Sequence, residues 1–254
     1  MLVPEKISKR GFDPLTYRFE DSAPELETIA KIADGVFWIR MPLWGRLKHI
    51  NVWLLEENEG WTIVDTGIFS EDVQRHWKAF FPKSLKGKPI TRVIATHLHP
   101  DHTGNAGWIC QEWGCELWMS RADFYMCKVM ANDGPSDVPE DAIRFYRRAG
   151  FTEERLEKYK QRFGQFGASI SSLPAGYERI RDNQYIDIGG REWRAVIGHG
   201  HAPEHVCLYC PELKMIIAGD QILPKITPNI SVFPSEPNAN PLREWINSCA
   251  RFRE

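Results

Sequence analysis

The segment that most constrains this chain is the run Thr96-His97-Leu98-His99-Pro100-Asp101-His102. It follows residues 92–95, which have the composition of a buried β-strand. Two residues separate His97 from His99, so in extended backbone both rings leave the same face of the chain and can bind one ion. Pro100 ends the strand, and Asp101 and His102 follow on the turn, where they can point toward a second ion.

The donor set of this run is imidazole nitrogen with carboxylate oxygen, without a thiolate. That set suits zinc, iron or manganese. A single histidine is usually an ordinary polar residue on a loop. Three histidines and an aspartate in this order predict a metal site.

Length and composition limit the remaining possibilities. A chain of 254 residues with 43% hydrophobic residues can build one large domain or two small ones, and no linker divides it. The net charge of −2 provides no general attraction to nucleic acid or anionic lipid. The six cysteines are scattered, and we find neither a signal-peptide pattern nor a membrane-spanning stretch. We therefore expect a cytoplasmic protein with a small-molecule substrate and no nucleic-acid or membrane partner; its oligomeric state is open.

Hydrophobic patterning predicts an α/β protein, in which two runs of strands alternate with helices. A short helix is expected over residues 24–33, closed by Asp34-Gly35. Residues 121–173 are expected to form a helical insert with helices at 140–149 and 153–165. The last predicted helix begins at Asn240, and the sequence stops at Glu254 inside its pattern, without a Gly or Asn cap. We expect the chain to be a fragment of a longer protein, truncated at its C-terminal part.

Three further motifs stand at predicted strand ends: Asp65-Thr66-Gly67, the run from Gly198 to His205, and Ala218-Gly219-Asp220. Together with the histidine run, and in this order, they resemble the metallo-β-lactamase superfamily over most of the chain. The resemblance implies a single domain over residues 1–254 with the four-layer αββα sandwich fold. It also implies a metal site at one edge, between the two sheets.

The resemblance also assigns roles to residues of this sequence. His97, His99 and His201 would bind the first metal ion, Asp101 and His102 the second, and Asp220 would bridge the two. Asp101 would also be catalytic, by orienting the nucleophile and passing a proton to the leaving group. Asp65 would support the histidine loop by hydrogen bonding. The other two histidines of the later motif, His199 and His205, would serve outside the metal-binding set.

Two divalent ions that share a water generate hydroxide at neutral pH and stabilise an oxyanion, so the implied activity is hydrolysis. Zinc is the first choice of metal, with iron or manganese possible. Asp220 stands where β-lactam-hydrolysing branches commonly carry cysteine or serine, and it resembles the glyoxalase II, lactonase and nuclease branches. The leading prediction is a binuclear hydrolase of a small ester, thioester or lactone.

Alternatives remain on the same fold. One is a mononuclear iron dioxygenase acting on a thiol or persulfide, and another is a scaffold that binds metal without chemistry. The balanced charge disfavours a nuclease. The superfamily takes a last histidine for the second metal from a later loop, and this sequence has none after His205. Either a longer protein supplies it or occupancy of the second site is weak.

Clues to the substrate are few. Residues 41–47 form an apolar hairpin tip, which is either a flap over a pocket or a tip packed on its own sheet. The aromatic residues of the insert could line a pocket, although helical spacing more often indicates packing.

Overall fold

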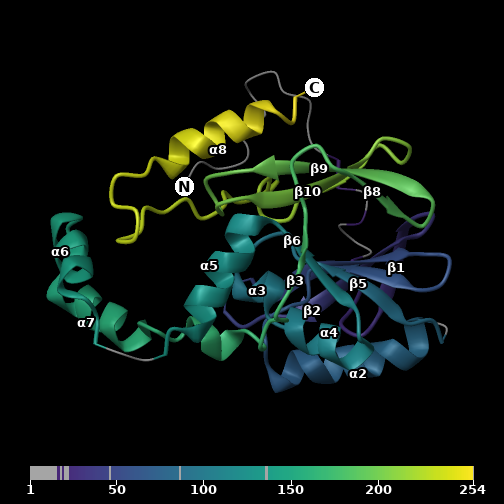
Figure 1. The fold of residues 1–254 in the computed structure, drawn as a ribbon, viewed down its shortest axis with the longest axis horizontal. Helices are drawn as coiled ribbons and strands as arrows, with labels where there is room; N and C mark the ends of the chain where they lie inside the picture. Colours follow the sequence, from purple (N-terminus) through teal and green to yellow (C-terminus); the bar gives the residue numbers. More distant parts are fainter. Residues whose placement is uncertain are drawn as a thin grey trace.

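Two β-sheets pack face to face in the computed structural model of the protein, and helices cover the outer face of each sheet (Figure 1). The structure describes residues 16–17, 19, 23–45, 47–85, 87–134 and 137–253. From one side to the other the layers are helix, small sheet, large sheet and helices. The predicted αββα sandwich is therefore confirmed.

The larger sheet has seven strands in chain order. The first four strands pair antiparallel, and the pairs from β4 to β7 are parallel. All four residues of β4 are buried, as expected for a central strand covered on both faces. The strands are β1 (Ile29–Ala33), β2 (Val36–Pro42), β3 (His49–Glu56), β4 (Trp61–Val64), β5 (Ile90–Ile94), β6 (Glu116–Met119) and β7 (Glu178–Arg179).

The smaller sheet is antiparallel, with the order β11-β10-β9-β8. Gly189 and Gly190 join β8 to β9 with φ of 64° and 78°, the left-handed conformation that a tight two-residue hairpin turn requires. Trp193 and Leu208 from this sheet pack against Leu55 and Ile94 of the larger one, in the core between the two sheets. The strands are β8 (Tyr185–Ile188), β9 (Arg191–Gly198), β10 (His205–Cys210) and β11 (Met215–Ile217).

Helices α2 (Glu71–Ser84) and α4 (Ala106–Trp113) cover the outer face of the larger sheet (Figure 1). The side chain of Ser70 caps α2 by accepting from the N–H of Val73. On the small-sheet side lies α8 (Pro241–Ala250), and Asn240 caps it by accepting from the N–H of Arg243. The short helix α3 (Pro100–Thr103) lies near the end of β5, where the site begins.

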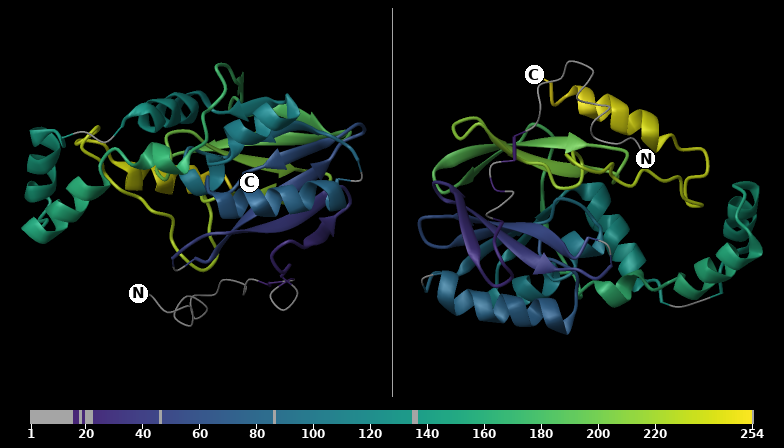
Figure 2. Two further views of the ribbon diagram at one scale, coloured as in Figure 1. Left: turned by 90° about the horizontal axis from the view of Figure 1, so that it is seen from below. Right: turned by 180° about the vertical axis from the view of Figure 1, so that it is seen from behind.

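The part of the insert that carries α6 (Glu140–Arg148) and α7 (Glu153–Arg162) projects from the sandwich as a helical arm, seen in two orientations in Figure 2. Both predicted helices are therefore present, and a 3₁₀ turn, η1 (Phe166–Ser169), follows them. The ring of Tyr146 contacts the rings of Phe145, Phe151 and Tyr159. These aromatic residues of the arm therefore pack on one another.

None of the helices among the described residues is both long and apolar enough to cross a membrane.

Two expectations about helices need correction. The helix expected over residues 24–33 is absent, because residues 29–33 form β1 and pair antiparallel with β2. Asp34-Gly35 forms the turn of a hairpin between Ala33 and Val36, and this strand pairing overrides a local spacing that also fits a helix. Conversely, α5 (Arg121–Asn132) was not predicted. The N–H of Ala122 in its first turn donates to Glu204, 82 residues away, which is a contact that no local pattern reveals.

Gly104 stands where α3 meets the loop that follows β4. A Cβ added there would lie 2.4 Å from the backbone nitrogen of Phe69 and 2.6 Å from the carbonyl oxygen of Gly67. We therefore expect Gly104→Ala to lower the free energy of unfolding by about 1–3 kcal/mol in urea denaturation. Gly134→Ala is the control, because its added Cβ would meet nothing within 4 Å. Equal stability of the two variants would contradict this view of the packing.

Candidate metal centre

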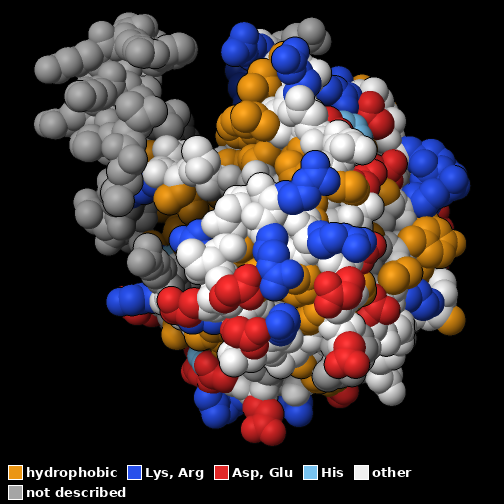
Figure 3. Space-filling view, turned by 90° about the vertical axis from the view of Figure 1, so that its left-hand side faces the viewer, with side chains coloured by type: hydrophobic (Ala, Val, Ile, Leu, Met, Phe, Trp, Pro, Cys, Tyr) orange, Lys and Arg blue, Asp and Glu red, His pale blue; other side chains and the backbone are white. Residues whose placement is uncertain are grey.

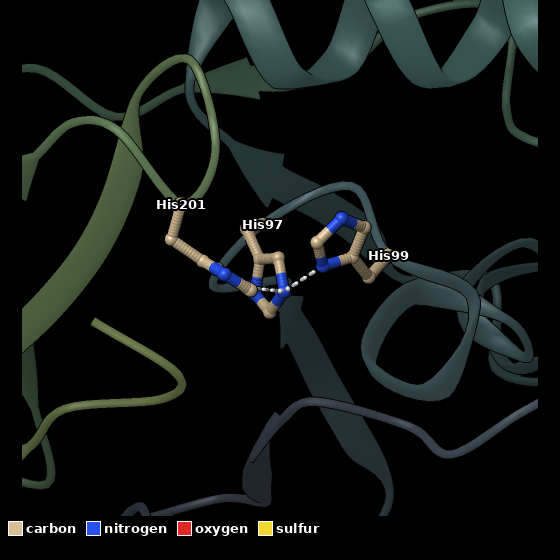
Figure 4. Close-up of side chains that lie close together, drawn as sticks. All are labelled: His97, His99 and His201. Carbon is tan, nitrogen blue, oxygen red and sulfur yellow. Dashed lines mark hydrogen bonds between the residues drawn. The ribbon is translucent and has the colours of Figure 1, made fainter. Parts of the chain in front are cut away.

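The histidines of two distant segments meet where strands of the two sheets end. His97 and His99 lie just beyond β5, which ends at Ile94, in a bend rather than in the strand itself. His201 lies on the loop between β9 and β10. Figure 4 shows the three rings pointing toward one another from these two loops. The structure therefore brings together the three residues predicted to bind the first metal.

The ring nitrogens of these three histidines converge closely. Nε2 of His97 lies 2.9 Å from Nδ1 of His99 and 3.2 Å from Nε2 of His201. Burial lowers the pKa of each imidazole, and neighbouring imidazolium charge would lower it further; the pKa of His99 falls to about 4. The three rings are therefore neutral at physiological pH, which is the form that binds a metal ion.

Hydrogen bonds on the far side of two rings fix which nitrogen carries the proton. The carbonyl oxygen of Asn229 lies 2.9 Å from Nδ1 of His201, so that nitrogen donates and Nε2 keeps a lone pair. Thr96 donates its hydroxyl hydrogen to Asp65 and accepts from Nδ1 of His97 at 3.0 Å. Two lone pairs, one on each Nε2, therefore face each other, which is unfavourable unless a cation binds both.

A second group of ligand atoms adjoins the first. It comprises one ligand atom each from His97, His102 and Asp220. Nδ1 of His102 donates to Asp65 at 2.8 Å, and Nε2 is buried without a hydrogen-bond partner. That nitrogen lies 3.5 Å from Asp220 and 3.7 Å from Asp101. A buried nitrogen that has no hydrogen-bond partner and lies beside two carboxylates fits a divalent cation that displaces its proton, so the donor set suits a second metal ion.

The charges of this group shift the pKa values in opposite directions. Burial disfavours the charged form of His102, but the carboxylates of Asp65, Asp101 and Asp220 outweigh burial and raise its pKa well above the ordinary value. Burial would also raise the pKa of Asp220, but His102, His201 and His205 lower it strongly. Asp220 is therefore an anion at neutral pH, placed among the nitrogens of both groups of ligand atoms.

The hydrogen bonds expected for Asp65 are present. Its carboxylate accepts from the backbone N–H of Thr96 at 2.8 Å and from Nδ1 of His102 at 2.8 Å. Its own N–H donates to Ile94, and its φ of 62° is the left-handed conformation. Such a conformation is unfavourable for a non-glycine residue, and these hydrogen bonds hold it in place.

His199 and His205 lie outside the two groups of ligand atoms. Nε2 of His205 accepts the backbone N–H of Asp220 at 3.1 Å, so its lone pair is occupied. The buried ring of His205 stacks on His97 with 4.6 Å between centroids. Nδ1 of His199 donates to the carbonyl of Pro203. Both rings therefore support loops that carry the candidate ligands.

Sequence reasoning missed the carbonyl of Asn229, which sets the tautomer of His201. This contact spans 28 residues and uses a backbone atom that every residue possesses. No side-chain pattern could have indicated it, because only the path of the chain after Asp220 brings that carbonyl to the imidazole.

Comparison with known proteins agrees with this architecture. The family profile described as "Metallo-beta-lactamase superfamily" matches residues 45–253. The chain belongs to this superfamily. A solved structure from Burkholderia ambifaria, described as a beta-lactamase domain protein, is 38% identical with a TM-score of 0.82. That match covers 93% of this chain and 70% of the Burkholderia chain.

Two curated relatives of this chain are less similar to it in sequence than the Burkholderia protein is. The linear primary-alkylsulfatase of Pseudomonas sp. (strain ATCC 19151) is 24% identical over 79% of this chain. The acyl-coenzyme A thioesterase MBLAC2 of Homo sapiens is 20% identical, also over 79% of this chain. The chain spans 38% of the length of the sulfatase and 68% of that of the thioesterase.

The lowered pKa of His99 predicts how the metal-free protein responds to acid. Below pH 6.5 the unfolded chain protonates this histidine, whereas the folded chain does so near pH 4. Stability should therefore fall as the pH decreases through this window, by up to about 1.4 kcal/mol per pH unit for one histidine. Chemical denaturation at pH 7, 6 and 5 measures the effect. Between pH 7 and pH 5 we expect His99→Gln to lose less free energy of unfolding than the wild type, and His199→Gln to lose as much as the wild type. The same pH dependence in all three proteins would contradict the lowered pKa of His99.

Proposed function

We propose that this chain is a metal-dependent hydrolase that acts on a small ester, thioester or lactone. The observation that carries the proposal is the pair of facing lone pairs on His97 and His201, beside the unpartnered Nε2 of His102. Nε2 of His102 has no hydrogen-bond partner, and the hydrogen-bond contacts of Nε2 in His97 and His201 are with other imidazole nitrogens. Divalent cations would satisfy these nitrogens, and zinc suits the nitrogen and oxygen donors.

In this proposal His97, His99 and His201 hold the first ion, Asp101 and His102 hold the second, and Asp220 lies between them. When bound, such ions lower the pKa of water toward 7 and stabilise a developing oxyanion. Asp220 lies 3.6 Å from His201 and 3.5 Å from His102, so one carboxylate reaches both groups. That position fits a bridging role.

Asp101 is the proposed catalytic residue. Its side chain is 22% exposed, whereas that of His102 is almost fully buried. The carboxylate is therefore accessible to a substrate while it remains 3.7 Å from Nε2 of His102. It can accept a hydrogen bond from the attacking water, orient it, and return a proton to the leaving group.

The relatives support hydrolysis as the reaction class, since their names describe a sulfatase and a thioesterase. Small-molecule chemistry is favoured over nucleic acid by the surface, because basic and acidic side chains are interspersed on the face shown in Figure 3. All six cysteines are free thiols, which fits the proposed cytoplasmic location.

The decisive experiment is elemental analysis of the protein as purified, followed by a screen of ester, thioester and lactone substrates. We expect zinc and hydrolysis of at least one substrate class. One iron per chain with oxygen consumption on a thiol or persulfide would instead identify a dioxygenase. Bound metal without turnover of any substrate would instead favour a scaffold that binds metal but does no chemistry.

We expect Asp101→Asn to reduce hydrolysis by about 10²- to 10⁴-fold, because the proton acceptor is lost. The three histidines of the first site are unchanged, so tightly bound zinc should remain at one ion per chain. Asp137→Asn, at an exposed aspartate, is the matched control and should retain wild-type rates. Full activity of Asp101→Asn would remove this residue from the mechanism.

The second site of this 254-residue chain should bind zinc more weakly than the first. Its proposed protein ligands are Asp101, His102 and the shared Asp220, and no histidine follows His205 in the sequence. Isothermal titration of the metal-free protein with zinc should therefore resolve one tight and one weaker binding step. In His102→Ala only the tight binding step should remain. Two sites of equal affinity in the wild type would contradict this expectation.

A further inference from the structure

The N-terminal turn of α5 carries a fully buried carboxylate, Asp123, which the proposed chemistry does not use. This carboxylate accepts three hydrogen bonds. One oxygen accepts the backbone N–H of Leu98 at 2.9 Å. The other accepts the backbone N–H of Glu204 at 2.7 Å and the hydroxyl of Ser120 at 3.1 Å.

The two backbone donors belong to the two loops that carry the candidate first-site ligands. Leu98 lies between His97 and His99, and Glu204 lies three residues after His201. One carboxylate therefore holds the main chain of both loops, which are about a hundred residues apart in the sequence. None of the converging ring nitrogens is hydrogen-bonded to Asp123 itself.

Glu204 strengthens this connection from the opposite direction. Its carboxylate accepts the backbone N–H of Ala122 at 2.9 Å, while its own N–H donates to Asp123. The first turn of α5 and the His201 loop are thus joined by a reciprocal pair of hydrogen bonds. Buried amides that lose such partners are strongly unfavourable, so the pair resists displacement of either segment.

The electrostatics of Asp123 fit a residue that holds two loops together through hydrogen bonds. Burial raises its pKa to about 6, although the hydrogen bonds from Glu204, Leu98 and Ser120 oppose the rise. The group is therefore mainly ionised at neutral pH, and its bonds to the backbone amides are charge-assisted. Such bonds are roughly twice as strong as neutral ones, which suits a contact that fixes the distance between two loops.

We propose that Asp123 is a positioning residue that sets the spacing between the His97–His99 pair and His201. The inference rests on the metal centre proposed above, and it adds a residue of α5 that acts through the backbone of both loops. Displacement of either loop by a fraction of an ångström would change the separation of the three converging nitrogens and hence their affinity for an ion.

The test is Asp123→Asn, which preserves shape but cannot accept at both oxygen positions. Either the amide of Leu98 or that of Glu204 then faces an N–H₂ group. We expect zinc affinity at the first site to fall about 10- to 100-fold in competition with a chromophoric chelator. The visible spectrum of the cobalt-substituted protein should also change, because it reports ligand geometry.

Two control variants separate positioning from general stability. Ser120→Ala removes one donor to Asp123 but leaves both loop amides bound, so zinc affinity should stay near the wild-type value. Phe124→Leu weakens the packing of α5 on Tyr177, whose ring centroid lies 3.9 Å from that of Phe124, and leaves the hydrogen bonds of Asp123 to both loops in place. If Phe124→Leu weakens zinc binding as much as Asp123→Asn at equal loss of melting temperature, the proposal is overturned.

A metal-independent measurement distinguishes this inference from the proposed function. In the metal-free protein, hydrogen exchange at the amides of Leu98 and Glu204 should be faster in Asp123→Asn than in the wild type for at least one of the two. Unchanged exchange at both would overturn the inference whatever the metal content. A wild-type protein that binds no zinc, iron or manganese would instead refute the proposed metal centre. The exchange rates at Leu98 and Glu204 would then still test whether Asp123 holds the two loops.

Discussion

The buried carboxylate of Asp65 is the contact on which the geometry of the candidate metal centre depends. It accepts the hydroxyl hydrogen of Thr96, and Thr96 can then accept from Nδ1 of His97. It also accepts from Nδ1 of His102. The orientation of both rings, with Nδ1 toward Asp65 or Thr96 and Nε2 toward the other candidate ligands, therefore follows from one carboxylate, whose left-handed backbone is held by the same hydrogen bonds. Loss of this carboxylate would release the tautomers of two candidate ligands at once.

The same region concentrates groups that ordinarily repel or lose solvation. The ring of His97 lies within 4.2–4.8 Å of four other imidazoles, measured between centroids. Burial lowers the pKa of most of these rings, and the carboxylates of Asp101 and Asp220 lie 3.7 and 3.5 Å from Nε2 of His102. Desolvated lone pairs and anions are unfavourable together in the absence of a cation. The cluster is therefore best explained by metal binding. The unfavourable free energy of burying these groups without a cation is thus connected to the proposed function.

Local sequence signals predicted most of the fold. Alternating and fully apolar runs marked the strands, and the capping residue Asn240 marked the start of the last helix, because these signals act within a few residues. The prediction failed at two helices. Residues 29–33 form a hairpin with β2, because Asp34-Gly35 is a tight hairpin turn and not a helix end, whereas α5 receives a hydrogen-bond acceptor from the distant Glu204. Only the second contact cannot be inferred from the residues that it organises.

The sequence by itself determined the donor set and its first pair, because His97 and His99 are joined by a single residue and must lie close together. It also placed the other candidate ligands at the ends of strands. Only the tertiary structure decided which lone pairs face inward. The carbonyl of Asn229 orients His201, and Asp123 joins its loop to that of His97 and His99. These contacts depend on how the two sheets pack, since backbone amides and carbonyls carry no side-chain identity that a sequence pattern could reveal.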